Sequence, residues 1–203
     1  MNIIERLIPG VNRKFGTGSV ILRQHILRYR FALAYMRAHD TILDAGCGCG
    51  YGTFLLAGTS ARVVGIDQDA ESIDYARTFY NSDNITWVCS SIEKYKGMLK
   101  SFSRIVCFET IEHCKSPEIL IDSLSEMLCD GGILICSVPV IPTRHFNPFH
   151  KHDFTDSSFT EIFTHRGYNI IDKLFQEETY LNLVVSKSAN PDLEAQPVIP
   201  FES

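Results

Sequence analysis

The chain has 203 residues, of which 45% are hydrophobic and 21% are charged, and this composition is typical of one soluble globular domain. The formal net charge of -5 argues against a broad surface for nucleic acid. No stretch has the roughly 18 uncharged apolar residues of a membrane span. Glu5 and Arg6 interrupt the apolar start, so we expect a cytoplasmic protein without a secretory signal.

Residues 1–40 mix apolar side chains with arginines and predict a helical arm. From residue 41 onward, apolar runs alternate with helical stripes. Each of these runs is apolar almost throughout, as parallel strands covered on both faces are. The five predicted strands are Ile42–Ala45, Arg62–Asp67, Ile85–Val88, Ile105–Phe108 and Ile133–Val138.

The clearest predicted helix precedes the fifth strand. Ser116 is a suitable N-cap, and Pro117 suits the first helical position. A helical stripe then runs through Leu120, Leu124, Met127 and Leu128. This spacing predicts a helix that packs one face on the sheet and ends before the two glycines at 131 and 132.

The pattern changes after Pro139. A loop rich in proline and histidine leads to Thr155, a predicted N-cap, and to a stripe that Gly167 closes. Two strand-like runs, 168–175 and 180–187, follow without a helix between them, so we expect an antiparallel hairpin at the sheet edge. Residues 188–203 lack periodicity and predict a disordered tail.

The expected fold is therefore a single α/β domain over residues 41–187. It is a Rossmann-like, doubly wound sheet of seven strands, mostly parallel, with a C-terminal antiparallel hairpin. Such open sheets bind ligands beyond the carboxyl ends of their strands.

A turn dense in glycine follows the first strand, at residues 46–50. Gly46, Gly48 and Gly50 allow positive φ and a close approach of a ligand to the backbone. The dinucleotide fingerprint Gly-x-Gly-x-x-Gly nevertheless fails, because Tyr51 or Thr53 stands in its third glycine position. The turn predicts a nucleotide-like ligand but not an ordinary dinucleotide.

Asp44 lies two residues before the first of these glycines. Its carboxylate would repel a pyrophosphate and attract a ligand that carries positive charge. S-adenosylmethionine, which has a sulfonium and an ammonium group, is such a ligand.

Four motifs in order give the chain a resemblance to the class I S-adenosylmethionine-dependent methyltransferases. They are Leu-Asp-Ala-Gly-Cys-Gly-Cys-Gly, Val-Val-Gly-Ile-Asp, Ile-Val-Cys-Phe-Glu-Thr-Ile-Glu-His and Leu-Cys-Asp-Gly-Gly-Ile-Leu-Ile-Cys-Ser-Val-Pro. The resemblance covers about residues 22–187. Flanking segments are similar to those of small bacterial methyltransferases that act on glycans or other metabolites.

The resemblance implies S-adenosylmethionine as the cofactor and assigns residues to it. Asp44 and Gly46 would hold the methionine part, and Asp67 would accept both ribose hydroxyls. Gln68 would lie against the adenine, and Ser91 stands where the family usually has an acid. The implied cofactor site comprises Tyr29, Asp44, Gly46, Cys47, Gly48, Gly50, Asp67, Gln68, Ser91, Ile92, Phe108 and Glu109.

The fourth strand should end close to the methyl acceptor. His113 is the predicted general base there, because an imidazole titrates near neutral pH. A purely structural bond of this histidine to Glu112 or to the following loop is an alternative.

A divalent metal is a second possibility, although not the favoured one. Glu109, Glu112, His113 and His150 offer two carboxylates and two imidazoles. This pattern resembles the small-RNA 3′-end 2′-O-methyltransferases. A helical turn at 109–113 would place the first three on one face, whereas an extended segment would turn Glu112 away.

The favoured function is S-adenosylmethionine-dependent O-methylation of a small molecule or glycan. Metal-dependent methylation of RNA 3′ ends, an NAD-type oxidoreductase and a non-catalytic cofactor-binding module remain alternatives. Nucleic acid and membrane partners are not expected, and the sequence leaves the oligomeric state open.

Overall fold

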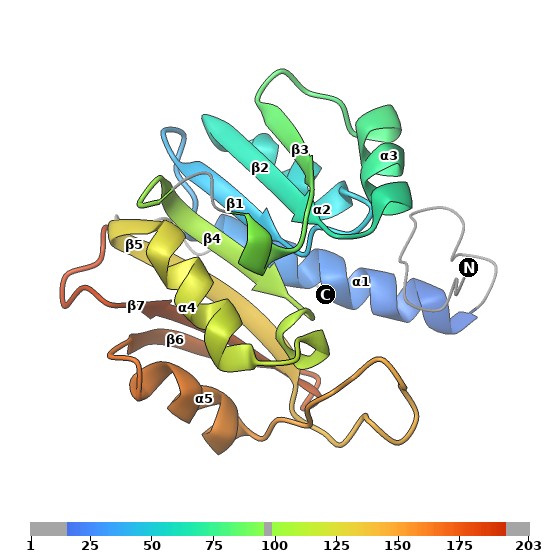
Figure 1. Cartoon of the computed structure of the whole chain (residues 1–203), viewed down its shortest axis with the longest axis vertical. Helices are drawn as coiled ribbons and strands as arrows, with labels where there is room; N and C mark the ends of the chain where they lie inside the picture. The colour runs from blue at the N-terminus through green and yellow to red at the C-terminus, as the bar shows by residue number, and fades with distance from the viewer. Residues whose placement is uncertain (1–15, 96–98, 194–203) are drawn as a thin grey trace.

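The computed structural model describes residues 16–95 and 99–193 and arranges them as one mixed sheet with helices on both faces (Figure 1). The strand order is β3-β2-β1-β4-β5-β7-β6. The seven strands are β1 Thr41–Ala45, β2 Arg62–Asp67, β3 Ile85–Cys89, β4 Phe102–Phe108, β5 Leu128–Pro139, β6 Asn169–Gln176 and β7 Tyr180–Ser186. Strands β1 to β5 pair in parallel, whereas β7 pairs antiparallel with β5 and with β6. This confirms the predicted doubly wound sheet with a terminal hairpin.

The helices cover the sheet from two sides, with α4 and α5 in front of it in Figure 1 and α1 behind. Their bounds are α1 Gly16–Leu33, α2 Tyr51–Ala57, α3 Ala70–Phe79, α4 Pro117–Met127 and α5 Asp156–Thr164, with single 3-10 turns η3 Ile92–Lys94 and η4 Ile111–His113. Helix α1 lies within residues 1–40, where the sequence predicts a helical arm. The rest of that prediction, at 1–15, and most of the predicted tail, at 194–203, lie outside the described residues.

Two apolar clusters, one on each face, hold these layers together. The front cluster joins α4 and α5 to the sheet through side chains such as Leu120, Leu124 and Phe159. The back cluster joins α1 and α2 to the other face through Tyr29 and Leu56. Because the parallel strands are covered on both sides, almost every residue in them is apolar, as the sequence indicated.

Helix α4 ends one residue earlier than the apolar stripe predicted. Leu128 was expected in the helix, but it is the first residue of β5 and pairs with Phe102 of β4. The register shifts between Phe102 and Arg104, and the strand continues through the glycines at 131 and 132. The burial of Leu128 against the sheet therefore outweighs its helical spacing, which sequence periodicity alone does not reveal.

Helix α5 begins as predicted. The Thr155 side chain accepts a hydrogen bond from the Ser158 N–H, and Ser158 in turn bonds the Thr155 N–H, which forms a capping box. Within the described part of the chain, no helix has the length and apolar character that crossing a bilayer requires.

Candidate functional site

The candidate site lies where the carboxyl ends of β1, β2 and β4 meet. The chain passes from β1 outward to β2 and β3, and then returns to the other side of β1 as β4. The strand order therefore reverses between β1 and β4, and open α/β sheets bind ligands at such a point. The predicted residues Asp44, Asp67 and Phe108 stand at the ends of these three strands.

Asp44 is fully buried in β1. Its carboxylate accepts hydrogen bonds from the Tyr29 hydroxyl at 3.1 and 3.2 Å and from the Thr53 hydroxyl at 2.6 Å. Burial raises the pKa of Asp44 to about 7; the two hydroxyls oppose this rise, and the charge of Asp67 adds to it. A cationic ligand beside Asp44 would favour its charged form.

Tyr29 reaches Asp44 from helix α1 across the first turn of α2. A Cβ added to Gly52 would lie 1.9 Å from Cζ of the Tyr29 ring, so the ring occupies the space that this glycine leaves. The rings of Tyr51 and Phe108 meet it edge-on, with centroid distances of 5.9 and 5.2 Å. The arm thus delivers Tyr29 to the end of β1, and Gly52 makes room for it.

Asp67 ends β2 and is partly exposed. One carboxylate oxygen accepts the Gly48 N–H at 2.9 Å, and the other accepts the Asp69 N–H at 2.9 Å. Each carboxylate oxygen can accept a second bond, so Asp67 keeps capacity for two hydroxyl donors. Gln68 follows with an exposed side chain.

The three glycines of the turn have different surroundings. All three have positive φ, at 84°, 52° and 89° in chain order. A Cβ on Gly46 would lie 2.2 Å from Thr110 Oγ1, and a Cβ on Gly50 would lie 2.6 Å from the Trp87 ring. A Cβ on Gly48 would meet nothing within 4 Å. Of the three, Gly48 is therefore the position that leaves the backbone open to a ligand.

Of the other predicted cofactor residues, three are buried and one is partly exposed. Cys47 and Phe108 are buried, and Ile92 is buried in the front apolar cluster. Ser91 is the N-cap of η3 and is partly exposed, and its carbonyl accepts the Lys94 N–H at 3.2 Å.

Arg28 and Glu109 form a buried polar pair beside β4. Arg28 Nη1 donates to Gln176 at 3.0 Å, and its guanidinium lies 4.3 Å from the centroid of the Tyr180 ring. Its Nε and Nη2 are buried without a hydrogen-bond partner, and Nε lies 4.0 Å from Glu109 Oε1. Glu109 accepts a bond from Ser137 at 2.7 Å, and burial raises its pKa while Arg28 opposes the rise.

The acceptor end of the site is built by η4 and by the loop after β5. Glu112 is fully buried, and its Oε1 lies 4.0 Å from Nε2 of His113. His150 comes from the loop, and its ring meets the His113 ring edge-on with centroids 4.6 Å apart. Ligand atoms of these three side chains all lie within 4.8 Å of one another.

The structure brings together three of the four residues considered for a metal. Glu109 precedes η4 with a φ of 46°, and its carboxylate bonds Ser137, so it is not part of the cluster of Glu112, His113 and His150. The segment 109–113 is neither a helical turn that gathers all three residues nor an extended strand. Of Glu109, Glu112 and His113, only the last two lie in the 3-10 turn η4.

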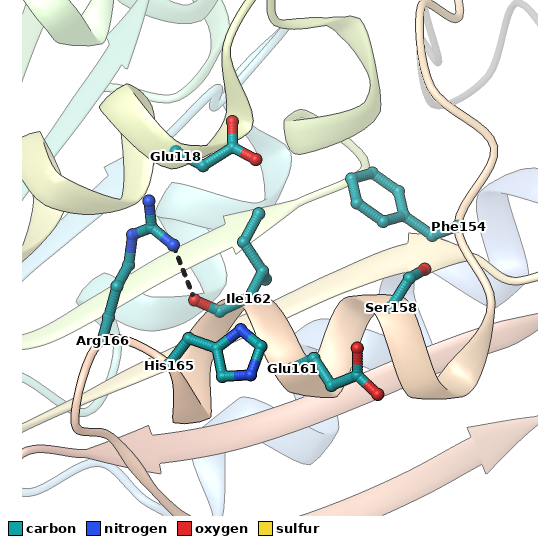
Figure 2. A pocket seen from close by; sticks show the side chains of 7 residues that line it. All are labelled: Glu118, Phe154, Ser158, Glu161, Ile162, His165 and Arg166. Atoms are coloured by element: carbon teal, nitrogen blue, oxygen red, sulfur yellow. Dashed lines mark hydrogen bonds between the residues drawn. The ribbon is translucent and has the colours of Figure 1, made fainter.

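A separate hollow lies between α4 and α5 (Figure 2). Arg166 at this hollow donates to the Ile162 carbonyl at 3.1 Å and to Asp122 at 3.0 Å, so its charge is already engaged. The lining residues are Glu118, Phe154, Ser158, Glu161, Ile162, His165 and Arg166. None of the predicted site residues is among them, and we place the site at the carboxyl edge of the sheet.

Sequence reasoning did not single out three residues that shape this edge. Thr53 stands where the dinucleotide fingerprint has its third glycine, and its hydroxyl instead binds Asp44. Gly52 precedes it and accommodates Tyr29. Arg28 is next to Tyr29 in α1, but neighbouring helical residues do not share a face, so the sequence alone gives no signal that both side chains reach this edge.

These residues fit S-adenosylmethionine. Asp44 offers a buried carboxylate for positive charge, and Asp67 offers free acceptor capacity for a ribose diol. Arg28 offers two buried nitrogen atoms, Nε and Nη2, that make no hydrogen bond, and such donors suit a carboxylate. The gap beside Gly48 admits a ligand to the backbone between the two acids.

Comparison with known proteins agrees with this arrangement. Residues 43–136 match the model of the methyltransferase domain family. A probable S-adenosylmethionine-dependent methyltransferase of Mycolicibacterium smegmatis is 29% identical over 84% of this chain. A ubiquinone biosynthesis O-methyltransferase of Coxiella burnetii is 33% identical over 47% of it. The chain spans 66% and 42% of the lengths of these two relatives.

Solved structures show the same fold. Magnesium protoporphyrin IX methyltransferase from Synechocystis PCC 6803, solved with bound S-adenosylmethionine, superposes with a TM-score of 0.69 at 17% identity. The match covers 84% of this chain and 83% of that protein. The motifs, the site at the reversal of strand order and these matches agree. Residues 43–136 carry a methyltransferase domain, and the chain is similar over most of its length to S-adenosylmethionine-dependent methyltransferases.

Proposed function

We propose that this chain transfers the methyl group of S-adenosylmethionine to an oxygen atom of a small molecule or glycan in the cytoplasm. The observation that carries the proposal is the pair of acids at adjacent strand ends, Asp44 and Asp67, with the open backbone of Gly48 beside them. A pyrophosphate would be repelled there, whereas a cationic nucleoside would be attracted.

Each end of the cofactor has a candidate partner in this chain. Asp67 would accept the ribose hydroxyls, and Asp44, held by Tyr29 and Thr53, would face the positive charge of the methionine part. Arg28 would bind the carboxylate of the methionine part through Nη2, since a buried guanidinium nitrogen without a hydrogen-bond partner costs free energy that an anion recovers.

S-adenosylmethionine, when bound, supplies an electrophilic methyl group. The protein's own task is then to align an acceptor oxygen with it and to remove the proton of that oxygen. We assign this proton handling to the edge formed by His113. Its Nδ1 lies 3.2 Å from the Phe149 carbonyl, which can only accept, so in the neutral ring Nδ1 would carry the hydrogen and Nε2 would be the nitrogen that accepts a proton.

The preference for oxygen has two supports. The acceptor edge contains two imidazoles and a carboxylate, which can handle the proton of a hydroxyl. The second support is that one relative, which matches part of the chain, is named as a ubiquinone biosynthesis O-methyltransferase. An amine would need such assistance only to lose its ammonium proton.

Calorimetric titration with S-adenosylhomocysteine and, separately, with NAD⁺ tests the cofactor assignment. We expect saturable binding of the first and none of the second. The opposite pair of results would overturn the proposal in favour of an oxidoreductase.

A panel of hydroxyl-bearing sugars, phenols, amines and RNA 3′ ends, read by mass spectrometry, tests the acceptor class. We expect methylation of hydroxyl compounds and a large loss of turnover in His113→Ala with unchanged cofactor affinity. Cofactor binding without methylation of any acceptor would indicate a non-catalytic module. Methylation of RNA alone would show that the acceptor is RNA and not a small molecule or glycan.

A further inference from the structure

We propose that Glu112, His113 and His150 bind one divalent cation of the zinc or manganese class at the acceptor edge. Two imidazoles and one carboxylate form a ligand set that such cations accept while keeping open positions for an exogenous oxygen. This inference rests on the proposed function, because it specifies how the acceptor hydroxyl is held and activated. The site uses three described side chains and does not include Glu109.

The first argument is that both imidazoles are already oriented for a cation. Nδ1 of His113 lies 3.2 Å from the Phe149 carbonyl, which fixes the hydrogen on that nitrogen and directs Nε2 toward Glu112. Nδ1 of His150 lies 2.6 Å from Thr143 Oγ1, which leaves Nε2 of His150 as its ligand atom. Histidine ligands characteristically bond their second nitrogen to such a partner.

The second argument is that the loop carrying His150 is fastened to η4. The Glu112 carbonyl accepts the Lys151 N–H at 2.8 Å and the His152 N–H at 3.3 Å. The His152 ring also lies within hydrogen-bond distance of the Cys114 carbonyl, at 3.0 Å. The three ligands come from segments almost 40 residues apart, and these bonds hold them together without a contribution from a cation.

The ligand atoms of the three side chains are slightly farther apart than those around one bound cation. Ligand atoms bound to one tetrahedral zinc ion lie roughly 3.3 Å apart, so the cluster, with atoms within 4.8 Å, must close slightly. The rings of His113 and His150, which are partly exposed, would shift slightly toward Glu112, which is fully buried.

Such a cation would lower the pKa of a bound hydroxyl. The proton would pass to solvent, and the cation would hold the resulting oxygen at the edge of β4. His113 would then act as a ligand of the cation and not as a free base.

Titration of the metal-stripped protein with Co²⁺, followed by its visible absorption and by calorimetry, tests the site without any methyl transfer. We expect one equivalent to bind, and we expect Glu112→Gln and His150→Ala each to weaken binding at least tenfold. The matched control is His145→Ala, which removes an exposed histidine from the same loop and should leave Co²⁺ affinity unchanged.

Thr143→Val provides a second route, because it removes the partner of His150 and not a ligand. We expect a roughly tenfold loss of Co²⁺ affinity, as loss of such partners typically causes. Absence of saturable binding at one equivalent, or equal affinity in the wild type and in His150→Ala, would overturn the proposal. Titration with S-adenosylhomocysteine in the same samples separates failure of the cation site from failure of the cofactor assignment.

Discussion

The cofactor edge and the acceptor edge of this sheet are built in different ways. At the cofactor edge, Asp44 binds Tyr29 and Thr53, which lie 15 and 9 residues away in the chain. At the acceptor edge, His113 contacts Phe149, which is 36 residues away. Asp44 has no exposed surface, whereas the side chain of His113 is 32% exposed. The surroundings of Asp44 are thus buried and close in the chain, whereas the acceptor edge depends on a long loop.

This difference indicates how the two halves can change independently. A buried strand end and its glycine turn tolerate few substitutions, because each side chain there fills space left by another. A surface loop tolerates many, and loops on a rigid scaffold are where specificity usually varies. The predictions below test whether the two edges are as separable as their construction suggests.

The largest effect should follow Gly52→Ala at the cofactor edge. The added Cβ would lie 1.9 Å from the Tyr29 ring, so Tyr29 must move away from Asp44. We expect a loss of about 1–3 kcal/mol in the free energy of unfolding and a roughly tenfold to hundredfold loss of affinity for S-adenosylhomocysteine. Thermal unfolding and calorimetry measure both quantities.

Gly58→Ala is the matched control, because Gly58 also lies at helix α2 but an added Cβ would meet only the Leu55 carbonyl at 3.4 Å. This variant reports the gain in helix propensity alone, with unchanged affinity. Equal affinities for Gly52→Ala and the wild type would show that Tyr29 does not organise the site.

The next effect should follow Arg28→Met. Methionine preserves the buried stem and removes the guanidinium whose Nε and Nη2 lack partners. Since hydrogen bonds to a charged group contribute about 1.5–3 kcal/mol, we expect a tenfold or greater loss of affinity for S-adenosylhomocysteine. The free energy of unfolding should fall as well, because the bond to Gln176 and the charge beside Glu109 are also lost. Arg30→Met, on the exposed side of the same helix, is the control. Unchanged affinity in Arg28→Met would assign Arg28 to the acceptor edge instead.

Sequence reasoning predicted the fold, and the cofactor site at the ends of β1 and β2 stays a prediction. The strands are short apolar runs, and Asp44 and Asp67 follow directly from their positions at strand ends. Gly52 and Arg28 were missed because their roles depend on how α1 packs across α2, which periodicity does not specify.

The acceptor edge shows the same limit in another form. His150 had been named as a possible partner of His113, and the loop does place the two rings in contact. Glu109 had been included with them, but its positive φ turns its carboxylate toward Ser137. A backbone conformation of this kind in a non-glycine residue has no signature in the sequence.

The pH dependence of cofactor binding should be smaller and centred near neutrality. Burial raises the pKa of Asp44 from 3.8 to about 7, so its charged form increases as the pH rises through 7. We expect affinity for S-adenosylhomocysteine, which retains the ammonium group, to rise up to about tenfold per pH unit below this pKa and to level off above it. Calorimetric titrations about one pH unit apart, from about pH 5.5 to about pH 8.5, measure how this affinity depends on pH.

Asp44→Asn should remove this dependence and supplies an independent check on the free protein. A carboxyl group with a raised pKa stabilises the fold while it is protonated, and that contribution is lost as the pH rises between about 4 and 7. The wild type should therefore lose stability over this interval relative to Asp44→Asn. Parallel stability profiles of the two proteins would contradict the raised pKa.

The smallest effect tests where the boundary between the two edges lies. Ser137→Ala removes the hydrogen bond to Glu109, which stands between Arg28 and η4. We expect a loss of about 1 kcal/mol in the free energy of unfolding and less than about a threefold change in cofactor affinity, because Arg28 keeps its bond to Gln176. Differential scanning calorimetry and titration with S-adenosylhomocysteine measure the two effects. An affinity loss beyond tenfold would mean that Glu109 itself contacts the cofactor, as its resemblance to the family implies, and the boundary would then move from Glu109 to Glu112.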